Sequence, residues 1–335
     1  MKGEEEFHFP VLLDRILEYT SNLENVKSPV IVDGTLGAGG HTISFHKNFP
    51  DSIIYSFDRD PEMVKLAADR MTSEGIRFSR ADCPDKKDAA GIHLLNFPFS
   101  RGPSLLASSE IFPDFILLDL GVSIHHFRSA KRGFSYTDGT LDMRLSPDLP
   151  NTASELLETL PETELADLFR ELGEERFSGR IARAVKENLP LKSAEELARV
   201  VMKAVPSIKE SRGSGKKIHP ATRIFQALRI YVNDELKELE AALNAFPEFL
   251  SPGGRMAIIT FHSLEDRMVK NAFKKIGGKI VKNRSAKREK YRTDAESPEF
   301  IILTPNPVIP DDSEIKINPP SRSAKLRVIE KTDRK

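Results

Sequence analysis

The sequence predicts an α/β protein in which a parallel, doubly wound sheet is interrupted by a helical insertion. Short apolar runs alternate with helical patterns over the first part of the chain, which is typical of a doubly wound sheet. The alternation stops after Asp119, where amphipathic segments follow, and two β-branched runs close the chain. We therefore divide the chain into a first sheet segment at 1–139, an all-helical insertion at 140–217 and a second sheet segment at 218–335.

Four strands are expected in the first sheet segment. Each is a short run of apolar, often β-branched residues that ends at a charged residue. Helical spacing of apolar residues follows the first two runs, as a βαβ unit requires. The four runs are Val30–Asp33, Ile53–Asp58, Ile76–Arg80 and Phe115–Asp119.

The insertion is expected to be helical. Apolar residues recur at three- and four-residue spacing in ASELLETLPETELADLFRELG, ERFSGRIARAVKEN and SAEELARVVMKAVPSI, which indicates amphipathic helices. Ser193 and Glu196 form a capping-box pattern at the start of the third stretch. The stretch GSGKK at 213–217 is typical of a hinge.

The second sheet segment is expected to hold one long helix and three strands. The helix begins near Ala221, and GGRMAIITFHS predicts a strand after it. Glu299–Pro305 and Ser323–Lys331 alternate and are rich in β-branched residues, so we expect them to form an antiparallel edge. Such an edge is typical of the class I S-adenosylmethionine-dependent methyltransferase sheet, a Rossmann-like fold, whereas a dinucleotide-binding fold usually lacks it.

The composition is that of an ordinary globular protein. At 335 residues and 39% hydrophobic, the chain can bury one large core or two smaller ones. Cys83 is the single cysteine, which excludes an internal disulfide and a cysteine-based metal cluster. No apolar run approaches the roughly 20 residues that span a bilayer, and the acidic start MKGEEEFHF does not resemble a secretory signal. We therefore expect a cytoplasmic protein without membrane contact.

Positive charge is concentrated locally, although the formal net charge is +0. Ten Lys or Arg stand against one acid between Lys270 and Arg292, and two further basic clusters cover Lys209–Arg223 and Arg322–Arg327. Solvated surface explains any single cluster equally well. Three clusters together, two of them interleaved with Gly and Ser, favour contacts with nucleic-acid phosphates.

The stretch VIVDGTLGAGGHT, Val30–Thr42, predicts a strand, a glycine-rich loop and a helix. Such a loop lets a ligand approach the backbone closely. A dinucleotide fingerprint requires a third glycine where Thr42 stands, and a P-loop requires a lysine after Gly40, where His41 stands. Asp33, at the junction of strand and loop, suits a ligand that carries an amino-acid ammonium group.

Asp58 indicates that the ligand also carries a ribose. It ends the second strand, nineteen residues past Gly39, where an acid can accept hydrogen bonds from ribose hydroxyls. The same acid would serve NAD. Together with Asp33, Thr42 and the antiparallel tail, however, the pattern favours S-adenosylmethionine. Asp119, at a third strand end, would then face the adenine or the reacting centre.

Several long and compositionally unusual motifs run through the chain. They are HFPVLLDRIL, DGTLGAGGHT, FDRDP, LLDLGVS, RGFSYTDGTLDMRL, GEERFSGRIARAV, HPATRIFQALRIYVNDEL, GGRMAIITFHSLEDRMVK and SRSAKLRVIEK. In these motifs the sequence resembles the ribosomal RNA small subunit methyltransferase H family over nearly its whole length. The resemblance implies S-adenosyl-L-methionine-dependent methylation of the exocyclic N4 amino group of a decoding-centre cytidine in small-subunit ribosomal RNA.

The resemblance also implies a domain layout and partners. The segments 1–139 and 218–335 would form the methyltransferase domain, and 140–217 an inserted substrate-recognition domain. The partner would be small-subunit ribosomal RNA or the assembled small ribosomal subunit. Members of the family often form homodimers, so a homodimer is a candidate assembly.

Carried over position by position, the resemblance implies a cofactor site in the loop and at the strand ends. Its residues are Gly39, Gly40, His41, Asp58, Phe99, Asp119 and His126. The family usually continues its fourth strand as D-L-G-V-S-S-P-Q, and His126 stands where that glutamine would lie. An apparent insertion makes Phe99 in NFPFS the nearest match to a family phenylalanine, with Phe97 as its rival.

Methylation of an aromatic amino group requires a well-placed acceptor. The lone pair of the amino nitrogen is shared with the ring, so the group must be held in line with the methyl donor and must lose a proton. Asp119 is the candidate acceptor, although Gly121 and Val122 stand where many amino methyltransferases carry prolines. Phe134 or Tyr136 could supply an aromatic wall for a flipped base.

The stretch FHSLEDR, Phe261–Arg267, closes the strand that follows the insertion. The spacing of His262, Glu265 and Asp266 differs from that of an H-E-x-x-H zinc site, so we expect no metal. Ser263 is interpreted as a helix cap with the two acids in the first helical turn. His262 has no role in that account, and we predict that it contacts the cytidine or its phosphate as a second catalytic residue.

Two other functions stay open on the residues alone. The first is a ribosome-assembly factor that binds the cofactor and RNA without catalysis. The second is an NAD-dependent oxidoreductase, against which stand Thr42 and the tail strands. Methyl transfer to RNA separates the first from an enzyme, and nicotinamide binding would support the second.

Overall fold

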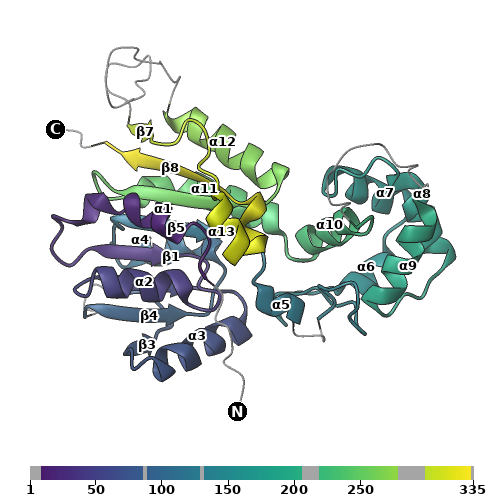
Figure 1. Cartoon of the computed structure of the whole chain (residues 1–335), viewed down its shortest axis with the longest axis horizontal. Helices are drawn as coiled ribbons and strands as arrows, with labels where there is room; N and C mark the ends of the chain where they lie inside the picture. The colour runs from purple at the N-terminus through teal and green to yellow at the C-terminus, as the bar shows by residue number, and fades with distance from the viewer. Residues whose placement is uncertain (1–8, 86–88, 129–131, 206–218, 278–298, 333–335) are drawn as a thin grey trace. The chain divides into compact units, whose positions relative to one another are not determined.

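The chain forms two compact units in the computed structural model, residues 1–121 together with 238–335, and residues 122–237 (Figure 1). The structure describes residues 9–85, 89–128, 132–205, 219–277 and 299–332. The GSGKK stretch that was expected to form a hinge lies outside these ranges. Among the described helices, none combines the length and the apolar character that crossing a membrane requires.

The first unit is built on a sheet with the strand order β3-β4-β2-β1-β5-β6-β8-β7 (Figure 1). Neighbouring strands are parallel from β3 to β6, and β8 is antiparallel to both β6 and β7. The antiparallel pair expected at the end of the chain is thus confirmed. The strands are β1 (Val30–Asp33), β2 (Ile53–Phe57), β3 (Phe78–Arg80), β4 (Gly91–Leu95), β5 (Phe115–Asp119), β6 (Arg255–Thr260), β7 (Phe300–Ile302) and β8 (Lys325–Lys331).

This strand order confirms the predicted fold class, a class I S-adenosylmethionine-dependent methyltransferase sheet with an inserted helical domain. β1 pairs with β2 through Val30 and Ile53, and with β5 through Ile31 and Phe115. Strand order reverses at β1, which makes its carboxyl end the topological switch point of the sheet. Open α/β sheets bind their ligands at that point.

One strand of this sheet was missed in the sequence. β4 lies between β2 and β3, whereas the predicted strand Ile76–Arg80 forms only the short edge strand β3. The residues of β4 read GIHLL, a run too short to show a period and preceded by a charged stretch. Its burial depends on contacts with β2 that lie far away in sequence, so the local pattern did not indicate it.

Helices cover both faces of the sheet, because successive strand residues point to opposite sides. Ile31 joins a buried cluster with Phe45 of α2, while Val32 joins a second cluster with Phe246 of α11. Each such side chain contributes about 2 kcal/mol on burial. The helices of this unit are α1 (Leu13–Glu18), α2 (Gly40–Asn48), α3 (Pro61–Ser73), α4 (Gly102–Ser108), α11 (Glu235–Phe249), α12 (Ser263–Gly277) and α13 (Asp312–Ile317), with 3-10 turns η1 (Ser21–Leu23), η2 (Phe99–Arg101) and η3 (Pro319–Ser323).

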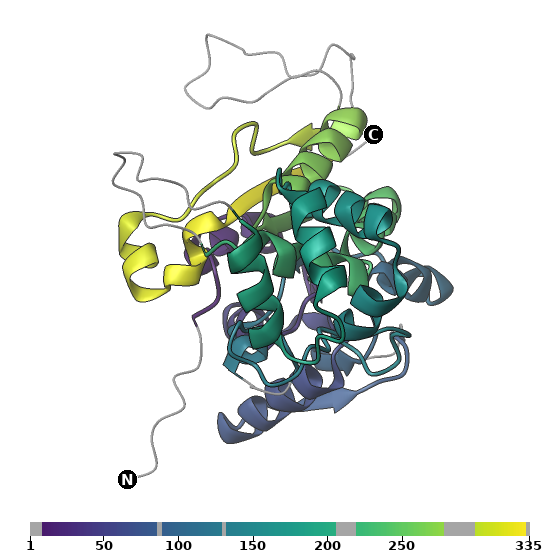
Figure 2. The ribbon, with the colours of Figure 1, turned by 90° about the vertical axis from the view of Figure 1, so that its right-hand side faces the viewer.

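Among its described residues, the second unit has helices joined by turns and loops, and no strand (Figure 2). Its apolar residues form a core of their own, which includes Phe169, Ile181 and Leu197. The capping box of Ser193 and Glu196 is present as predicted. The predicted insertion at 140–217 lies inside this unit. Its helices are α5 (Ile124–Arg128), α6 (Ala153–Thr159), α7 (Glu162–Glu171), α8 (Ser178–Glu187), α9 (Ala194–Ala204) and α10 (Thr222–Val232).

The single long helix expected from Ala221 is wrong, because the structure divides it into α10 and α11. The break falls at Asn233, which is fully buried, and at Asp234, whose φ is 51°. The Asn233 amide donates to the Met143 carbonyl over 2.8 Å, and its oxygen accepts from the Leu145 N–H over 2.8 Å. These long-range hydrogen bonds end α10, and nothing in the local sequence marks them.

A buried ion-pair cluster joins α12 to β8. Asp266 accepts from Arg327 over 2.7 Å and from Lys325 over 3.2 Å, and Arg327 is only 6% exposed. Two cations of the predicted basic cluster Arg322–Arg327 thus serve the fold. Burial opposes ionisation of Asp266, but the hydrogen bond and charge of Arg327, followed by those of Lys325, hold the pKa of its carboxyl below its ordinary value.

We predict that Asp266→Asn destabilises the protein at neutral pH by about 2 kcal/mol, because it leaves the Arg327 charge without its counter-ion. The carboxyl has a lower pKa when folded than when unfolded, so its contribution is present above the unfolded value near 4 and is lost as the pH falls through the folded value. Urea unfolding at pH 7 and pH 3 measures this. The exposed Asp69→Asn on α3 is the control, and an equal effect of Asp266→Asn at both pH values would contradict the assignment.

Candidate active site

Predicted site residues from three neighbouring strands meet at one edge of the sheet. Asp33 ends β1, Asp58 follows β2 directly and Asp119 ends β5. The sheet order places β1 between β2 and β5, and parallel strands present their carboxyl ends at the same edge. The glycine-rich loop leaves β1 at this edge and leads into α2 at Gly40.

The loop requires glycines for conformation and for space. Gly37 and Gly39 have φ values of 49° and 79°, which favour glycine. A Cβ at Gly39 would lie 3.2 Å from Met71 Cε and 3.3 Å from the Cβ of Ala67. The loop therefore packs tightly on α3 at Gly39, where a larger residue would clash.

Asp58 holds the loop through hydrogen bonds to the main chain. Its Oδ2 accepts from the Gly37 N–H over 2.8 Å, and its Oδ1 accepts from the Asp60 N–H over 2.9 Å. Each carboxylate oxygen can accept more than one hydrogen bond. The half-buried Asp58 carboxylate is thus oriented by the backbone at the edge of the sheet where ligands bind.

Asp33 stabilises the loop from inside, which corrects its expected role toward a ligand ammonium. Its side chain is fully buried, with Oδ2 accepting from Thr42 Oγ1 over 2.6 Å and Oδ1 from the Thr35 N–H over 3.1 Å. Burial raises the pKa of the Asp33 carboxyl, against a lowering by His41 and Thr42. Thr42 also lies 2.8 Å from Ser56 Oγ. The residue that replaces a third glycine therefore ties α2 to β1 and β2.

His41 and Asp119 form the least satisfied polar pair of the first unit. His41 is 5% exposed, and its Nε2 lies 3.6 Å from Asp119 Oδ2. Both ring nitrogens of His41 and Asp119 Oδ1 are buried without a hydrogen-bond partner among the described residues. The Asp119 N–H donates to Thr35 Oγ1 over 2.7 Å. Because buried polar atoms are normally paired, these atoms are poised to meet a ligand. The sequence did not single out Thr35.

His262 lies against a buried carboxylate at the end of β6. Its Nε2 is 3.1 Å from Glu265 Oε1, and Glu265 is 3% exposed. Glu265 Oε2 accepts from the N–H groups of Phe261 and His262 over 2.8 and 3.3 Å. Ser263 is the first residue of α12, and Glu265 in the first turn of that helix satisfies the two N–H groups that precede it. His262 is held in place by Glu265, a partner that the sequence analysis assigned only to the first turn.

The two candidate phenylalanines occupy different surroundings. Phe99 begins η2, and its Cβ would lie 3.1 Å from a Cβ built on Gly34, at the start of the glycine-rich loop. The ring of Phe97 lies under the Arg101 guanidinium, with 4.4 Å between the guanidinium carbon and the ring centroid. Phe99 therefore stands beside the loop, as a cofactor-binding residue requires.

The remaining predicted residues belong to the second unit. His126 lies in α5, 4% exposed, with its ring centroid 5.4 Å from that of Phe134. Phe134 is itself buried in the helical core, so it offers no open face to a base. Tyr136 stacks on His219 with centroids 4.5 Å apart. The expected place of His126 beside the cofactor stays a prediction.

Comparison with known proteins identifies relatives over almost the whole chain. The family model described as the MraW methylase family matches residues 5–332. A Ribosomal RNA small subunit methyltransferase H from Syntrophobacter fumaroxidans is 42% identical, covering 97% of this chain and 96% of the relative. One from Acidobacterium capsulatum is 39% identical, covering 98% and 99%. A solved structure of a putative rRNA-methylase from Clostridium thermocellum aligns over 98% of this chain and all of that one, with 9% identity and a TM-score of 0.42. The chain belongs to the MraW methylase family.

Proposed function

We propose that this protein methylates the exocyclic N4 amino group of a decoding-centre cytidine in small-subunit ribosomal RNA, in the cytoplasm, with S-adenosyl-L-methionine as methyl donor. The methylase family supports methyl transfer, and the names of the relatives support ribosomal RNA as the substrate. The observation that carries the proposal is the pair His41 and Asp119, whose buried atoms without a partner among the described residues lie at the ligand-binding edge of the sheet.

The residues at this edge fit the cofactor. When bound, S-adenosyl-L-methionine supplies an electrophilic methyl group on its sulfonium. Carboxylate oxygens such as those of Asp58 accept hydrogen bonds from ribose hydroxyls. Gly39 packs against α3 and Gly40 against Pro10, so these glycines let the loop fold closely beside Asp58. Phe99 adds an apolar wall at Gly34. A bound pyrophosphate would fit less well, because Asp58 and Asp119 place negative charge at this edge.

Asp119 is the acceptor that the chemistry requires. Its Oδ1 has no partner among the described residues, so it can accept a hydrogen bond from the cytidine amino group and orient the nitrogen lone pair toward the methyl group. As the N–C bond forms and the S–C bond breaks, the amino nitrogen becomes cationic and releases a proton toward this carboxylate. His41 lies beside this carboxylate, with 3.6 Å between its Nε2 and Asp119 Oδ2.

His262 is assigned a contact with the cytidine or its phosphate. Its ring lies against the buried Glu265 carboxylate, with 3.1 Å between Nε2 and Oε1. An imidazole N–H can donate a hydrogen bond to a phosphate oxygen or to the carbonyl oxygen of a cytosine ring. Fixing the ring in advance lowers the entropy lost when the substrate binds.

We expect Asp119→Asn to lower kcat for methyl transfer about 100-fold, because the amino proton loses its acceptor. The assay follows tritiated methyl from S-adenosyl-L-methionine into small subunits from cells lacking this protein, with nucleoside analysis for N4-methylcytidine. Affinity for S-adenosyl-L-methionine is measured by calorimetry in parallel, which separates lost binding from lost catalysis. If the wild-type protein binds S-adenosyl-L-methionine but transfers no label to RNA, the protein is a non-catalytic assembly factor and the enzyme assignment fails.

We expect Asp58→Asn to weaken S-adenosyl-L-methionine binding by about 2 kcal/mol, roughly 30-fold, because a charged acceptor for the ribose hydroxyls is replaced by a neutral amide. Calorimetry on the purified full chain measures the change. Asp51→Asn, an exposed position just before β2, is the matched control. Equal affinity in Asp58→Asn and wild type would remove Asp58 from the cofactor site, and binding of NAD instead would support the oxidoreductase.

A further inference from the structure

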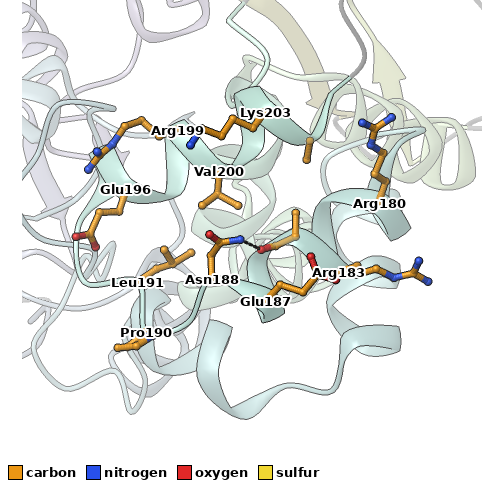
Figure 3. A pocket seen from close by; sticks show the side chains of 12 residues that line it. Arg180, Arg183, Glu187, Asn188, Pro190, Leu191, Glu196, Arg199, Val200 and Lys203 are labelled. Atoms are coloured by element: carbon orange, nitrogen blue, oxygen red, sulfur yellow. Dashed lines mark hydrogen bonds between the residues drawn. The ribbon is translucent and has the colours of Figure 1, made fainter.

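A positively charged groove runs between α8 and α9 of the second unit. It has a volume of about 530 Å³ and is open to solvent (Figure 3). α8 contributes Arg180 and Arg183, and α9 contributes Arg199 and Lys203. The spacings of three and four residues place each pair on one face of its helix. None of these residues falls in the basic clusters that the sequence analysis selected.

The two carboxylates of the groove do not neutralise it. Glu196 is occupied by the α9 capping box, where it accepts from the N–H groups of Lys192 and Ser193 over 2.9 and 3.3 Å. The hydrogen bond from Lys192, followed by those from Ser193, holds the pKa of Glu196 below its ordinary value. Glu196 is therefore anionic, and its carboxylate is used by the backbone N–H groups. Glu187 is exposed on α8. Four cations thus stand against one uncommitted carboxylate.

The four cationic groups are largely available. Arg183 approaches Glu162 only to 3.5 Å, and Arg199 approaches Glu195 only to 3.9 Å. Exposed pairs of this kind contribute about 0–1 kcal/mol and exchange readily. Arg180 makes no ion pair with any residue that the structure describes, and the same holds for Lys203 within these ranges.

A second groove of the same unit has the opposite charge. It lies between α7 and α10, has a volume of about 370 Å³, and is lined by four acids, Glu164, Asp167, Glu171 and Asp234, and by Lys237. One helical unit therefore carries a cationic groove and an acidic one. A polyanion is attracted to the first and repelled by the second, so this charge pattern orients it.

We propose that the α8–α9 groove binds the sugar-phosphate backbone of the substrate ribosomal RNA, an inference that rests on the function proposed above. Three of its four cations are arginines, whose planar guanidinium groups match phosphate oxygens in pairs. An open groove lined by long cationic side chains follows a single-stranded backbone without reading its bases. The groove supplies affinity and register, while the chemistry takes place elsewhere.

The test removes the two cations without ion pairs. Arg180→Gln/Lys203→Gln is compared with Arg15→Gln/Lys47→Gln, which removes one arginine and one lysine from exposed positions of the first unit that line neither groove. Binding of small-subunit ribosomal RNA to the full chain is measured across a salt series. For the groove variant we expect Kd to rise about tenfold at ~0.1 M salt and the slope of log K against log salt to fall by about 1.4, since each single-strand phosphate contact contributes about 0.7.

The control and a rescue variant make the outcome decisive. The control variant should change Kd less than about twofold, and Arg180→Lys/Lys203→Arg should restore the salt slope. If both glutamine variants lose RNA affinity equally, overall charge explains binding and the proposal is overturned. If the salt slope of the groove variant is unchanged, the groove does not contact the RNA. Lost binding of polyglutamate with unchanged RNA binding would assign the groove to an acidic protein instead.

Failure of the groove and failure of the proposed function give different results. If the groove binds RNA as proposed, the groove variant has a higher KM for ribosomal RNA, while its kcat and its affinity for the cofactor are unchanged. If wild type binds RNA through the groove but transfers no methyl group, the RNA surface stands and the enzyme assignment fails. If methyl transfer occurs and the groove variant matches wild type in KM, only the groove proposal fails.

Discussion

The buried hydrogen bond between Asp33 and Thr42 is the constraint on which the site depends. It joins the end of β1 to the first turn of α2 over 2.6 Å, and the six residues from Gly34 to Gly39 must turn tightly between them. That turn forces the positive φ values of Gly37 and Gly39. It also brings the Gly37 N–H to the Asp58 carboxylate. The buried and hydrogen-bonded Asp33 carboxylate thereby fixes the conformation of the loop and, through the Gly37 N–H, the position of the Asp58 carboxylate.

The same edge combines satisfied and unsatisfied polar groups. Asp33 is fully paired and serves structure, whereas His41 and Asp119 are buried with atoms that lack partners among the described residues. An unpaired buried polar atom costs about 1–3 kcal/mol. A stable core below the site, with β1 covered by helices on both faces, can offset that cost. The unsatisfied atoms mark where ligand binding recovers free energy.

The second unit carries its own core, and its charges divide between two grooves. Phe169, Ile181 and Leu197 pack within the unit and belong to a core made of its own residues. The cations of α8 and α9 line one groove, and the acids of α7 together with Asp234 line the other. Lys325 and Arg327, in contrast, belong to a basic cluster that the sequence suggested for nucleic-acid binding. In the structure both pair with Asp266 and so join β8 to α12.

The sequence by itself determined the fold class, most strands and the strand-end acids, because period, β-branching and glycine spacing are local properties. Asp58 and Asp119 could be located in this way, and so could the capping box of Ser193. Only the tertiary structure decided that Asp33 faces inward, that β4 lies beside β2, and that Asn233 divides α10 from α11. The place of β4 and the break at Asn233 depend on partners distant in sequence, namely β2 and Met143. Asp33 bonds Thr35 and Thr42, which are near in sequence, but its burial arises only when the sheet and α2 have packed.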